Sequence, residues 1–480
     1  MKIKNIFTLF AAAMLAMSCS TDNGMTYEED KDFVMNGGNN DDPDDNGGLI
    51  KDDTSDTPAE VKFKSFRGMV MCGYQGWFNA EGDGANKGWT HYTATGYNRF
   101  APGCCSIEYW PDMSEYTKAY DTEFKYANGK TAQTFSSYDY ETADLHFKWM
   151  KEYGIDGAII QRFKSAVENT TNPEPALKVI ENCIKAAEKY GVAVMLEYDL
   201  SGLSDKDDVQ KIIDDWKKLN DRFHFTDPTK CPNYIWQNNK PLVGFYGIGL
   251  YKSTKTDTPE QYLQMFDQME GRDGKAGALS YFAGTGYYWQ QGPNVTNSDA
   301  KDFATWEPVY KRCAVISPWA VGRFGNMNAV DGKVSIIKDN AEWCNDNKIV
   351  YAPVAFPGFS WRNTQTKWNN GIPTLPNDVY DASPRLGGKF FWYQVGTYVA
   401  NGANAIFVAM FDEIDEGTAV FKCAKKNMTP INSSDVNPDG KFLSYDDVDD
   451  TGYYMFLCGQ AHQWLNGTKG YNRATLPAMK

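Results

Sequence analysis

Residues 155–161, Ile-Asp-Gly-Ala-Ile-Ile-Gln, form a short apolar run, and residues 193–198, Ala-Val-Met-Leu-Glu-Tyr, form a second one. Between them, the segment 175–190 places Leu177, Ile180 and Ile184 at spacings of three and four, which indicates a helix with one apolar face. Nearly continuous apolar runs are typical of parallel strands that helices cover. The stretch 155–198 therefore predicts a strand–helix–strand unit with parallel strands.

The same alternation recurs along the chain. Strands are expected at residues 68–72, 155–161, 193–198, 242–246, 278–282, 314–318, 349–356 and 405–411. Helices are expected at residues 143–153, 175–190, 205–219, 261–270, 300–312, 334–344, 386–400 and 452–465. Eight such units predict an α/β fold, a single (β/α)8 TIM barrel. A doubly wound open sheet is the alternative, although no glycine-rich phosphate loop follows the first strand.

One connection is much longer than the others. It runs over residues 78–137, between the first strand and its helix, and its aromatic residues include Trp89, Tyr92, Phe100, Tyr109, Trp110 and Tyr116. Loops of this length inside a domain are usually functional or disordered. The aromatic content predicts an ordered loop that lines the site.

The first 18 residues have the features of a signal peptide, with Lys2 and Lys4 followed by an apolar stretch over 6–17. The stretch ends at Ser18-Cys19, and a Cys after small residues resembles a lipoprotein signal, in which Cys19 is acylated. We therefore expect an exported protein held on a membrane by its N-terminal lipid, at the cell surface or facing the periplasm. A plain secretory signal is the alternative.

Residues 19–62 are rich in Asp, Asn, Gly and Thr and are expected to form a disordered acidic tether. This tether has a charge of −10, so the expected catalytic domain, residues 63–480, has only −6 of the total −14. Phosphate contacts need clusters of Lys and Arg, and an acidic chain therefore argues against a nucleic acid partner. We expect a monomer.

The cysteines do not have metal-binding spacing. Ten are present, Cys19 is assigned to the anchor, and the other nine include no Cys-x-x-Cys pair. We expect mostly free, buried thiols, no metal site and no cofactor. Residues 447–452 resemble the start of a calcium loop, but Cys458 occupies the twelfth position, where a bidentate Glu is needed, so a helix cap is favoured.

Catalytic groups of TIM barrels lie at the carboxyl ends of the strands. The residues at these positions are aromatic and carboxylic, with two Arg, and such side chains suit the flat C–H faces and the hydroxyls of sugars. Core packing is the competing explanation for any single Trp. The expected substrate-binding residues are Tyr74, Trp77, Trp89, His91, Gln161, Arg162, Tyr198, Asp199, Tyr246, Trp289, Trp319, Arg323, Phe359, Trp361 and Asp412.

The most specific motif is Met-Phe-Asp-Glu-Ile-Asp-Glu-Gly at 410–417. If the chain turns helically after the last strand, Glu413 and Glu416 face the same way, with Cβ atoms ~5–6 Å apart. Glycoside cleavage needs two carboxyls beside the bond, and crowding them raises the pKa of one. Glu413 and Glu416 are therefore the predicted catalytic residues. An acidic helix N-terminus is the competing interpretation.

Several strings resemble the family 99 and family 71 glycoside hydrolases, in particular a bacterial branch described as xylosidases or arabinosidases. The strings are CGYQGWF at 72–78, WPDMSEY at 110–116, YGIDG at 153–157, QRF at 161–163, YDLSG at 198–202, FPGFSW at 356–361 and FDEIDEG at 411–417. Together they lie within residues 67–422 and so extend over nearly the whole expected catalytic domain.

The resemblance implies a (β/α)8 barrel and retaining cleavage of an α-linked glycan. Glu413 matches the base that deprotonates the sugar 2-hydroxyl, which then attacks its own anomeric carbon, and Glu416 matches the acid and later base. Ile414-Asp415 replaces the Trp-His pair of the family, and Asp412 replaces an Asn, so the contacts between the two Glu differ. The leading hypothesis is an endo-acting glycosidase with a glycan substrate; a non-catalytic glycan-binding lipoprotein and a lyase are the alternatives.

Overall fold

The computed structural model describes residues 51–202, 206–251, 257–271, 278–369, 372–374 and 380–479. The predicted signal peptide, Cys19 and the tether up to residue 50 lie outside these ranges.

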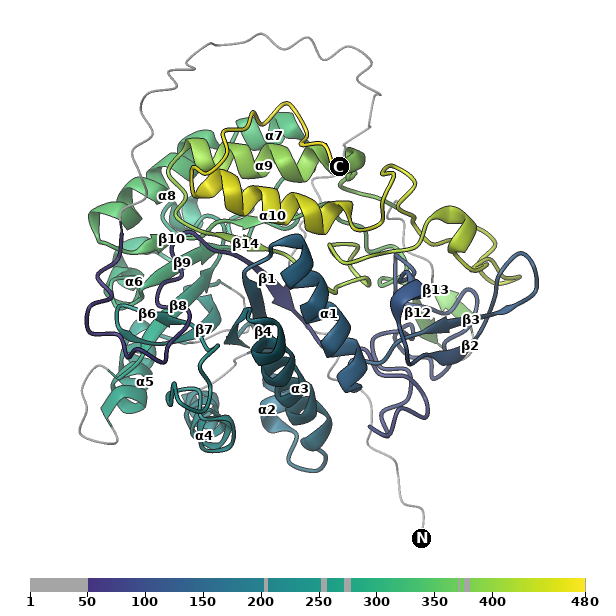
Figure 1. Cartoon of the computed structure of the whole chain (residues 1–480), viewed down its shortest axis with the longest axis horizontal. Coiled ribbons are helices and arrows are strands. Elements are labelled where there is room, and N and C mark those ends of the chain that lie inside the picture. The colour runs from purple at the N-terminus through teal and green to yellow at the C-terminus, as the bar shows by residue number, and fades with distance from the viewer. Residues whose placement is uncertain are drawn as a thin grey trace.

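A parallel sheet forms the centre of the molecule, and every predicted strand is present in it (Figure 1). Its strands are β1 (Val70–Tyr74), β4 (Gly157–Phe163), β5 (Ala193–Asp199), β7 (Lys240–Ile248), β8 (Ser280–Thr285), β9 (Val315–Pro318), β10 (Val350–Tyr351), β11 (Val354–Ala355) and β14 (Ile406–Val408). The hydrogen-bonded order is β10-β9-β8-β7-β5-β4-β1-β14-β11, and the short β6 (Trp236–Gln237) pairs antiparallel with β7.

The sheet curls until its two edges meet in one segment of chain. β10 pairs with β9 and β11 pairs with β14, and only Ala352 and Pro353 separate β10 from β11. The N–H of Ala352 still donates to Ile316 O at 2.9 Å, and Pro353 O accepts from the N–H of Phe407 at 3.2 Å. The predicted TIM barrel is therefore confirmed, and the open-sheet alternative is wrong.

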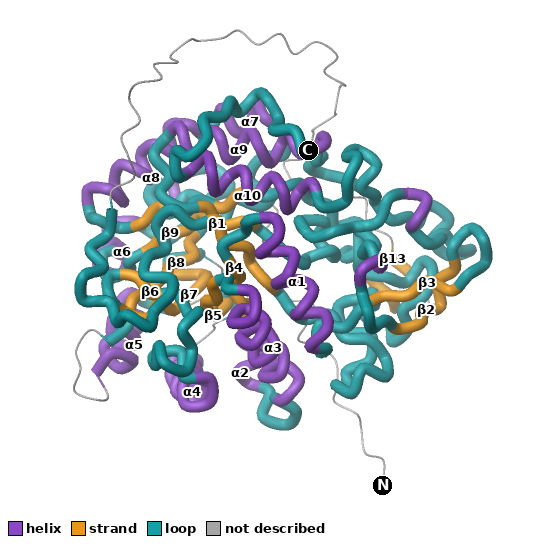
Figure 2. The backbone as a smooth tube through the Cα atoms, in the orientation of Figure 1, coloured by secondary structure: helices purple, strands orange, loops and turns teal. Residues whose placement is uncertain are grey.

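Helices surround the strands (Figure 2). They are α1 (Tyr140–Tyr153), α2 (Lys164–Glu168), α3 (Glu174–Tyr190), α4 (Lys206–Phe223), α5 (Pro259–Gly271), α6 (Phe303–Tyr310), α7 (Met327–Asp331), α8 (Val334–Asp346), α9 (Lys389–Ala400) and α10 (Tyr453–Leu465). Short 3-10 turns occur at Met113–Glu115, Gly292–Asn294, Leu386–Gly388 and Lys426–Met428. Each predicted helix is present, and α1 ends where Gly154 takes the left-handed backbone conformation (φ 77°) that glycine allows.

Alternation along the strands separates two sets of side chains. In β5, Met195 and Glu197 point into the barrel, where they face Gly244 of β7. Leu196 and Tyr198 lie on the outer side, in the core between strands and helices. Because side chains alternate between the faces of a strand, only every second residue at a strand end can reach the barrel mouth.

A lobe lies beside the barrel and contains the hairpins β2 (Tyr120–Lys125)–β3 (Thr131–Thr134) and β12 (Lys367–Asn369)–β13 (Ile372–Thr374) (Figure 1). The long loop 78–137 supplies β2 and β3 to it, and as predicted the loop is ordered. Its aromatics mainly pack on one another: Phe100 stacks on Trp110 at 5.6 Å, and Phe124 lies 4.7 Å from Phe100. The expectation that these rings line the site is therefore wrong for this cluster.

The end of the expected tether is part of the folded body. Asp52 pairs with Arg67 at 3.0 Å, with the two side chains 10% and 6% exposed, and also accepts from Gln237 at 2.7 Å. Val61 is buried, and the N–H of Lys62 donates to Pro232 O. The tether boundary at residue 62 is therefore wrong, because residues 51–62 have apolar and ionic partners on the barrel.

All nine cysteines in the described ranges are free and buried, as expected. Within those ranges, no group of three His, Cys, Asp or Glu residues could hold a metal ion, and no helix is long and apolar enough to cross a membrane. Asp447 accepts hydrogen bonds from Gly387 and Tyr454, and Asp450 accepts from the N–H of Gly452 beside α10. The N-cap residue of α10 is Gly452, and no side chain caps the helix, so the favoured interpretation of this segment as a helix cap is wrong.

Candidate active site

The two predicted catalytic Glu lie in a loop directly after β14, residues 412–417, which we call the acid loop. The loop is a series of turns, so the helical turn on which the spacing argument depended is absent, and so is the competing helix N-terminus. Glu413 O accepts from the N–H groups of Thr418 and Ala419 at 3.2 and 3.0 Å, which folds the loop back on itself. Gly417 permits this with φ +67°, and a Cβ there would lie 3.0 Å from the backbone N of Ser360.

Asp412 joins the acid loop to the end of β1. Its two carboxylate oxygens accept from the backbone N–H groups of Gln75 and Gly76, both at 2.8 Å, and the residue is fully buried. Burial raises the pKa of Asp412 to about 7, while the two N–H groups favour the charged form. Because both oxygens are occupied and inaccessible, the predicted substrate contact by Asp412 is wrong, and the residue positions the loop.

Glu413 is held by two side-chain donors. Gln75 Nε2 donates to Oε1 at 2.9 Å, and Thr418 Oγ1 donates to Oε2 at 2.7 Å. The residue is 5% exposed. Burial raises the pKa of Glu413 well above its ordinary value, and repulsion from Glu416 and Asp415 raises it further. Glycoside cleavage needs two carboxyls beside one bond, and this loop supplies two Glu within four residues.

Glu416 is the more accessible of the two. It is half-buried, and no hydrogen bond of its carboxyl to another residue occurs within the described ranges. Burial and the neighbouring Asp415 raise the pKa of Glu416 above its ordinary value. A carboxyl with these properties can keep a proton near neutral pH and present it to a ligand.

A stack of three rings borders the acid loop. His91 lies flat on Trp77, with ring centroids 3.9 Å apart at 6°, and Trp77 stacks on Phe163 at 5.0 Å. His91 Nδ1 is 3.4 Å from Asp415 Oδ2, and the side chain of His91 is 34% exposed. Burial, followed by the charge of Lys87, lowers the pKa of His91 to about 3, so the ring is neutral. The structure brings Trp77 and His91 beside the acid loop.

Across the barrel, Glu197 lies in the lumen on β5. Its Oε2 accepts from Gln161 Nε2 at 2.7 Å, and its Oε1 has no hydrogen-bond partner in the described part of the chain. Gly244 and Gly284 make room for it, since a Cβ at either would approach Glu197 within 3.0 Å. Burial and the charge of Asp199 raise the pKa of Glu197 to about 8. The wall of the lumen formed by the ends of β4 and β5 is therefore polar, and its side chains can donate as well as accept hydrogen bonds.

The same wall continues over β7 and β9. Tyr246 lies 5.4 Å from Trp319, and Trp319 lies 6.2 Å from Phe407 of β14, which links the wall to the strand before the acid loop. Arg323 pairs with Asp299, and their side chains are 9% and 15% exposed. The structure therefore places five expected substrate-binding residues on one wall: Gln161, Asp199, Tyr246, Trp319 and Arg323.

Three expected contact residues point away from the lumen. Tyr74 is fully buried, and its hydroxyl bonds to His146 of α1 at 2.9 Å. Arg162 makes two 2.6 Å bonds to Asp215 of α4, which also accepts from the hydroxyl of Tyr198 at 3.0 Å. Tyr74, Arg162 and Tyr198 each come one position after a residue that points into the lumen. Because side chains alternate along a strand, these three point toward the helices. The predicted substrate contacts of Tyr74, Arg162 and Tyr198 are wrong.

The remaining expected aromatics have mixed positions. Trp289 is fully buried and packs on Tyr310 of α6 and Trp343 of α8, so its predicted role in the site is wrong. Trp89 packs within the lobe, 5.3 Å from Phe100, and does not belong to the ring stack beside the acid loop. Phe359 and Trp361, 5.4 Å apart after β11, are nearly buried and belong to the core cluster that contains Phe407.

Three residues of the site are absent from the expected substrate-binding residues. Gln75 follows β1 and Glu197 lies near the end of β5, so the sequence places both at strand ends, and strand alternation was the signal that separates them from Tyr74 and Tyr198. Glu108 lies in the long loop, where its side chain bonds to Ser360 and its backbone N–H bonds to Ile414 of the acid loop. No local pattern marks Glu108, because its partners are distant in the sequence.

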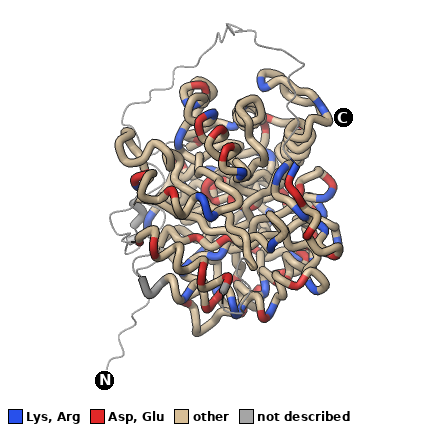
Figure 3. The backbone as a smooth tube through the Cα atoms, turned by 90° about the vertical axis from the view of Figure 1, so that its left-hand side faces the viewer, with Lys and Arg blue, Asp and Glu red and all other residues tan. Residues whose placement is uncertain are grey.

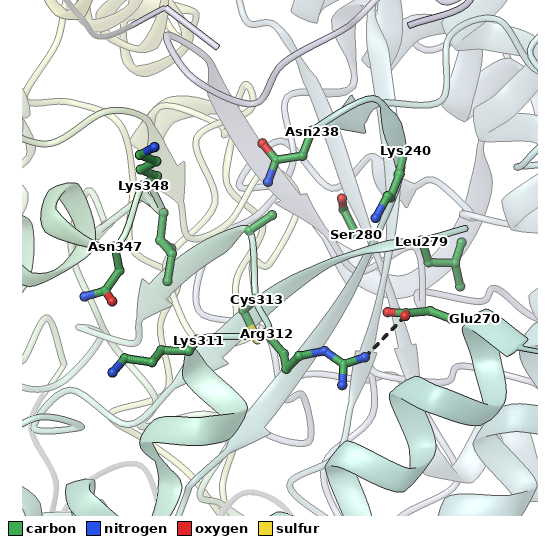
Figure 4. A pocket seen from close by; sticks show the side chains of 12 residues that line it. Asn238, Lys240, Glu270, Leu279, Ser280, Lys311, Arg312, Cys313, Asn347 and Lys348 are labelled. Carbon is green, nitrogen blue, oxygen red and sulfur yellow. Dashed lines mark hydrogen bonds and ion pairs between the residues drawn. The ribbon is translucent and has the colours of Figure 1, made fainter. Parts of the chain in front are cut away.

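A hollow of about 300 Å³ opens at the other end of the barrel, where β7, β8 and β9 begin (Figure 4). Lys240 and Ser280 line it, and Arg312 donates to Glu270 at 3.2 Å across it. Basic and acidic residues are interspersed over the face shown in Figure 3. The amino ends of barrel strands serve stability in this fold, so the acid loop at the carboxyl end is the candidate active site.

Comparison with known proteins identifies the fold. The glycoside hydrolase family 99 endo-alpha-mannosidase from Bacteroides thetaiotaomicron, solved with BIS-TRIS-propane, is 14% identical, with a TM-score of 0.55 over 84% of this chain and 99% of that chain. The chain has a family 99-like fold. A second structure of the same protein gives 14% identity and a TM-score of 0.56 over 85% and 100% of the two chains. No family sequence model matches the chain, and no curated protein sequence does.

The similarity confirms the resemblance at the level of fold: the architecture is glycosidase-like, and the whole mannosidase barrel is represented in this chain. At 14% identity the comparison does not extend to the substrate or to the roles of individual residues.

Proposed function

We propose that the protein is a glycoside hydrolase that cleaves an α-linked glycan internally, with retention of configuration. The observation that supports it best is the placement of Glu413 and Glu416 in one short loop at the carboxyl end of the last barrel strand, with Glu413 held by Gln75 and Thr418. Two interacting carboxyls at the carboxyl end of a TIM barrel are the groups that glycoside cleavage requires. The walls of the lumen add rings and polar groups suited to sugar hydroxyls.

The environments of the two Glu support different roles. Burial and repulsion raise the pKa of both carboxyls, but only Glu413 receives side-chain donors, from Gln75 and Thr418. Because donors stabilise a carboxylate, we assign the negative charge of the pair to Glu413 on this geometry. Glu416 is more accessible and keeps the proton. In the proposed reaction Glu413 removes the proton of the sugar 2-hydroxyl, whose oxygen attacks the anomeric carbon as Glu416 protonates the leaving oxygen. Water then attacks the anomeric carbon, Glu416 takes the proton of the water, the bond to the 2-oxygen breaks, and Glu413 returns its proton to that oxygen.

We also propose that the protein is exported and held on a membrane through an acylated Cys19. The support is the sequence of residues 1–19 and the acidic stretch that follows. Radiolabelled palmitate should enter the wild-type protein in cells and be absent from a Cys19→Ala variant. Equal labelling of the two proteins would contradict the anchor.

The test of the activity is incubation with α-mannans, α-glucans and arabinoxylans, followed by sizing of the products. Oligosaccharides of several lengths are expected from one of the α-linked polymers, and none from the Glu413→Gln variant. Binding without products would favour a non-catalytic glycan-binding protein, and products with an unsaturated ring would identify a lyase. Glu270→Gln, at the opposite end of the barrel, is the control and should react as the wild type does.

A further inference from the structure

The main-chain carbonyls of the acid loop receive hydrogen bonds from other segments. Ile414 O accepts from the N–H groups of Glu108 and Tyr109, at 2.8 and 3.3 Å. Asp415 O accepts from Thr364 Oγ1, and Glu416 O accepts from the N–H of Ser360 at 2.9 Å. The path of the backbone around Glu416 is therefore set by the long loop after β1 and by the segment 360–364 after β11.

One buried side chain joins those two segments. Glu108 Oε2 accepts from Ser360 Oγ at 2.8 Å, and Oε1 accepts from the N–H groups of Asn363 and of Thr364, the latter at 3.4 Å. Asn363 Nδ2 returns a bond to Ile107 O at 2.8 Å. The carboxyl thus binds the same short segment that supplies the donors to Asp415 O and Glu416 O.

The buried position of Glu108 has a desolvation cost that its contacts must offset. The residue is fully buried, and the charge of Arg362 acts on it without a salt bridge between the two in the described ranges. Burying a carboxyl without a salt-bridge partner is unfavourable unless hydrogen bonds satisfy it. Burial raises the pKa of Glu108 to about 8, and its hydrogen bonds and the charge of Arg362 oppose this. An apolar residue would avoid the cost but would leave three donors of segment 360–364 unpaired.

We propose that Glu108 is a positioning residue that fixes Glu416 for proton donation through Ser360 and Thr364. The inference rests on the proposed function and deepens it. Glu413 has its own donors, Gln75 and Thr418, which do not depend on Glu108. Loss of Glu108 should therefore impair the acid step selectively, and not the base.

Leaving-group dependence is the measurement that separates this role from general support of the fold. Aryl α-glycosides of the sugar identified by the polymer screen would be compared, from phenyl to 2,4-dinitrophenyl. For Glu108→Ala we expect a rate loss of about 100-fold with phenyl, the size of general acid assistance, shrinking to a few-fold with dinitrophenyl. Glu108→Gln, which keeps an acceptor oxygen for the two N–H groups, should restore most of the rate.

The matched control is Glu115→Ala, in the same loop, whose carboxylate bonds to Lys422 and Trp149 and not to segment 360–364. Its leaving-group dependence should equal that of the wild type. An equal loss for Glu108→Ala with every leaving group would overturn the proposal, since it would show a uniform defect. If Glu108→Ala does not fold, the milder Thr364→Val variant is expected to show the same steepened dependence, and an unchanged dependence overturns the proposal.

Hydrogen exchange separates failure of this inference from failure of the proposed function. Glu108→Ala should accelerate amide exchange over residues 411–419 by about tenfold or more, while β4 and β5 stay protected as in the wild type. If the wild type cleaves no glycan, the proposed function fails, and amide exchange in Glu108→Ala becomes the test of the positioning role of Glu108. Unchanged exchange over residues 411–419 would then overturn that role.

Discussion

Gln75 donates a hydrogen bond from its side-chain amide to Glu413 Oε1 over 2.9 Å. Because Gln75 follows β1 and Glu413 follows β14, the bond joins the ends of two strands that are neighbours in the barrel. Next to this bond, the carboxylate of Asp412 accepts from the backbone N–H groups of Gln75 and Gly76. The first and last strands of the barrel thus fix the proposed base together.

Replacing Gln75 by Met should lower kcat/KM by about 10- to 100-fold, since a hydrogen bond to a charged group contributes ~1.5–3 kcal/mol. Loss of a donor to the carboxylate disfavours the charged form, so the pKa of Glu413 should rise. The acidic limb of the kcat/KM–pH profile should move to higher pH. Gln133→Met, whose amide bonds to Asp121 in the exposed β2–β3 hairpin, is the control. A Gln75→Met profile that overlays the wild type would contradict the assignment.

The alkaline limb of the profile should report Glu416. Burial and Asp415 raise the pKa of Glu416 to about 8, so the acid stays protonated, and activity persists, up to that region. Asp415→Asn removes a like charge, which lowers the pKa of Glu416, and the alkaline limb should move to lower pH. His91→Gln, which removes the partner of Asp415 without removing a charge, should leave the limb in place. A limb that moves upward in Asp415→Asn would count against Glu416 as the acid.

Arg162 should matter for stability and not for substrate binding. Arg162→Met breaks a buried ion pair and leaves Asp215 uncompensated, which costs roughly 3–5 kcal/mol. For a chain of this size that corresponds to a melting temperature lower by roughly 3–6 °C. KM of the folded fraction should be unchanged. A raised KM with an unchanged melting temperature would restore the original prediction that Arg162 contacts the glycan.

Residues 51–62 should stabilise the folded body. A chain starting at Lys51 should melt several degrees above one starting at residue 63, because the shorter chain loses the Asp52–Arg67 pair and the buried Val61. Asp52→Asn in the longer chain should reproduce part of the loss. Asp56→Asn, at an exposed position, should not. Equal melting temperatures for the two chains would return the boundary to residue 62.

The strands and helices were predictable because their signals are local. Apolar runs such as 193–198 identify covered parallel strands, and the spacing within 175–190 identifies a helix. The β2–β3 hairpin was missed, although Asn128-Gly129 between its strands is a common hairpin turn. Closure of the barrel through β10 and β11 depends on which strands pair across Pro353, and no local pattern specifies that.

Prediction of the site was less complete. The spacing of Glu413 and Glu416 after an apolar strand was enough to identify the acid loop. Its turns could not be predicted, because the donors from Ser360 and Thr364 that shape it lie more than fifty residues away. Adjacent residues such as Gln161 and Arg162 were both assigned to the lumen, although strand alternation permits only one. Glu108 could not be found, since its role depends on a partner at residue 360.

The central claim is that Glu413 and Glu416 act as base and acid on one glycosidic bond. It is tested most directly by Glu413→Gln and Glu416→Gln with paired phenyl and 2,4-dinitrophenyl α-glycosides. Both variants should lose at least about 100-fold with the phenyl glycoside. Only Glu416→Gln should recover with the dinitrophenyl glycoside, because that leaving group needs no proton. Near-wild-type turnover by Glu413→Gln with either substrate would contradict the account.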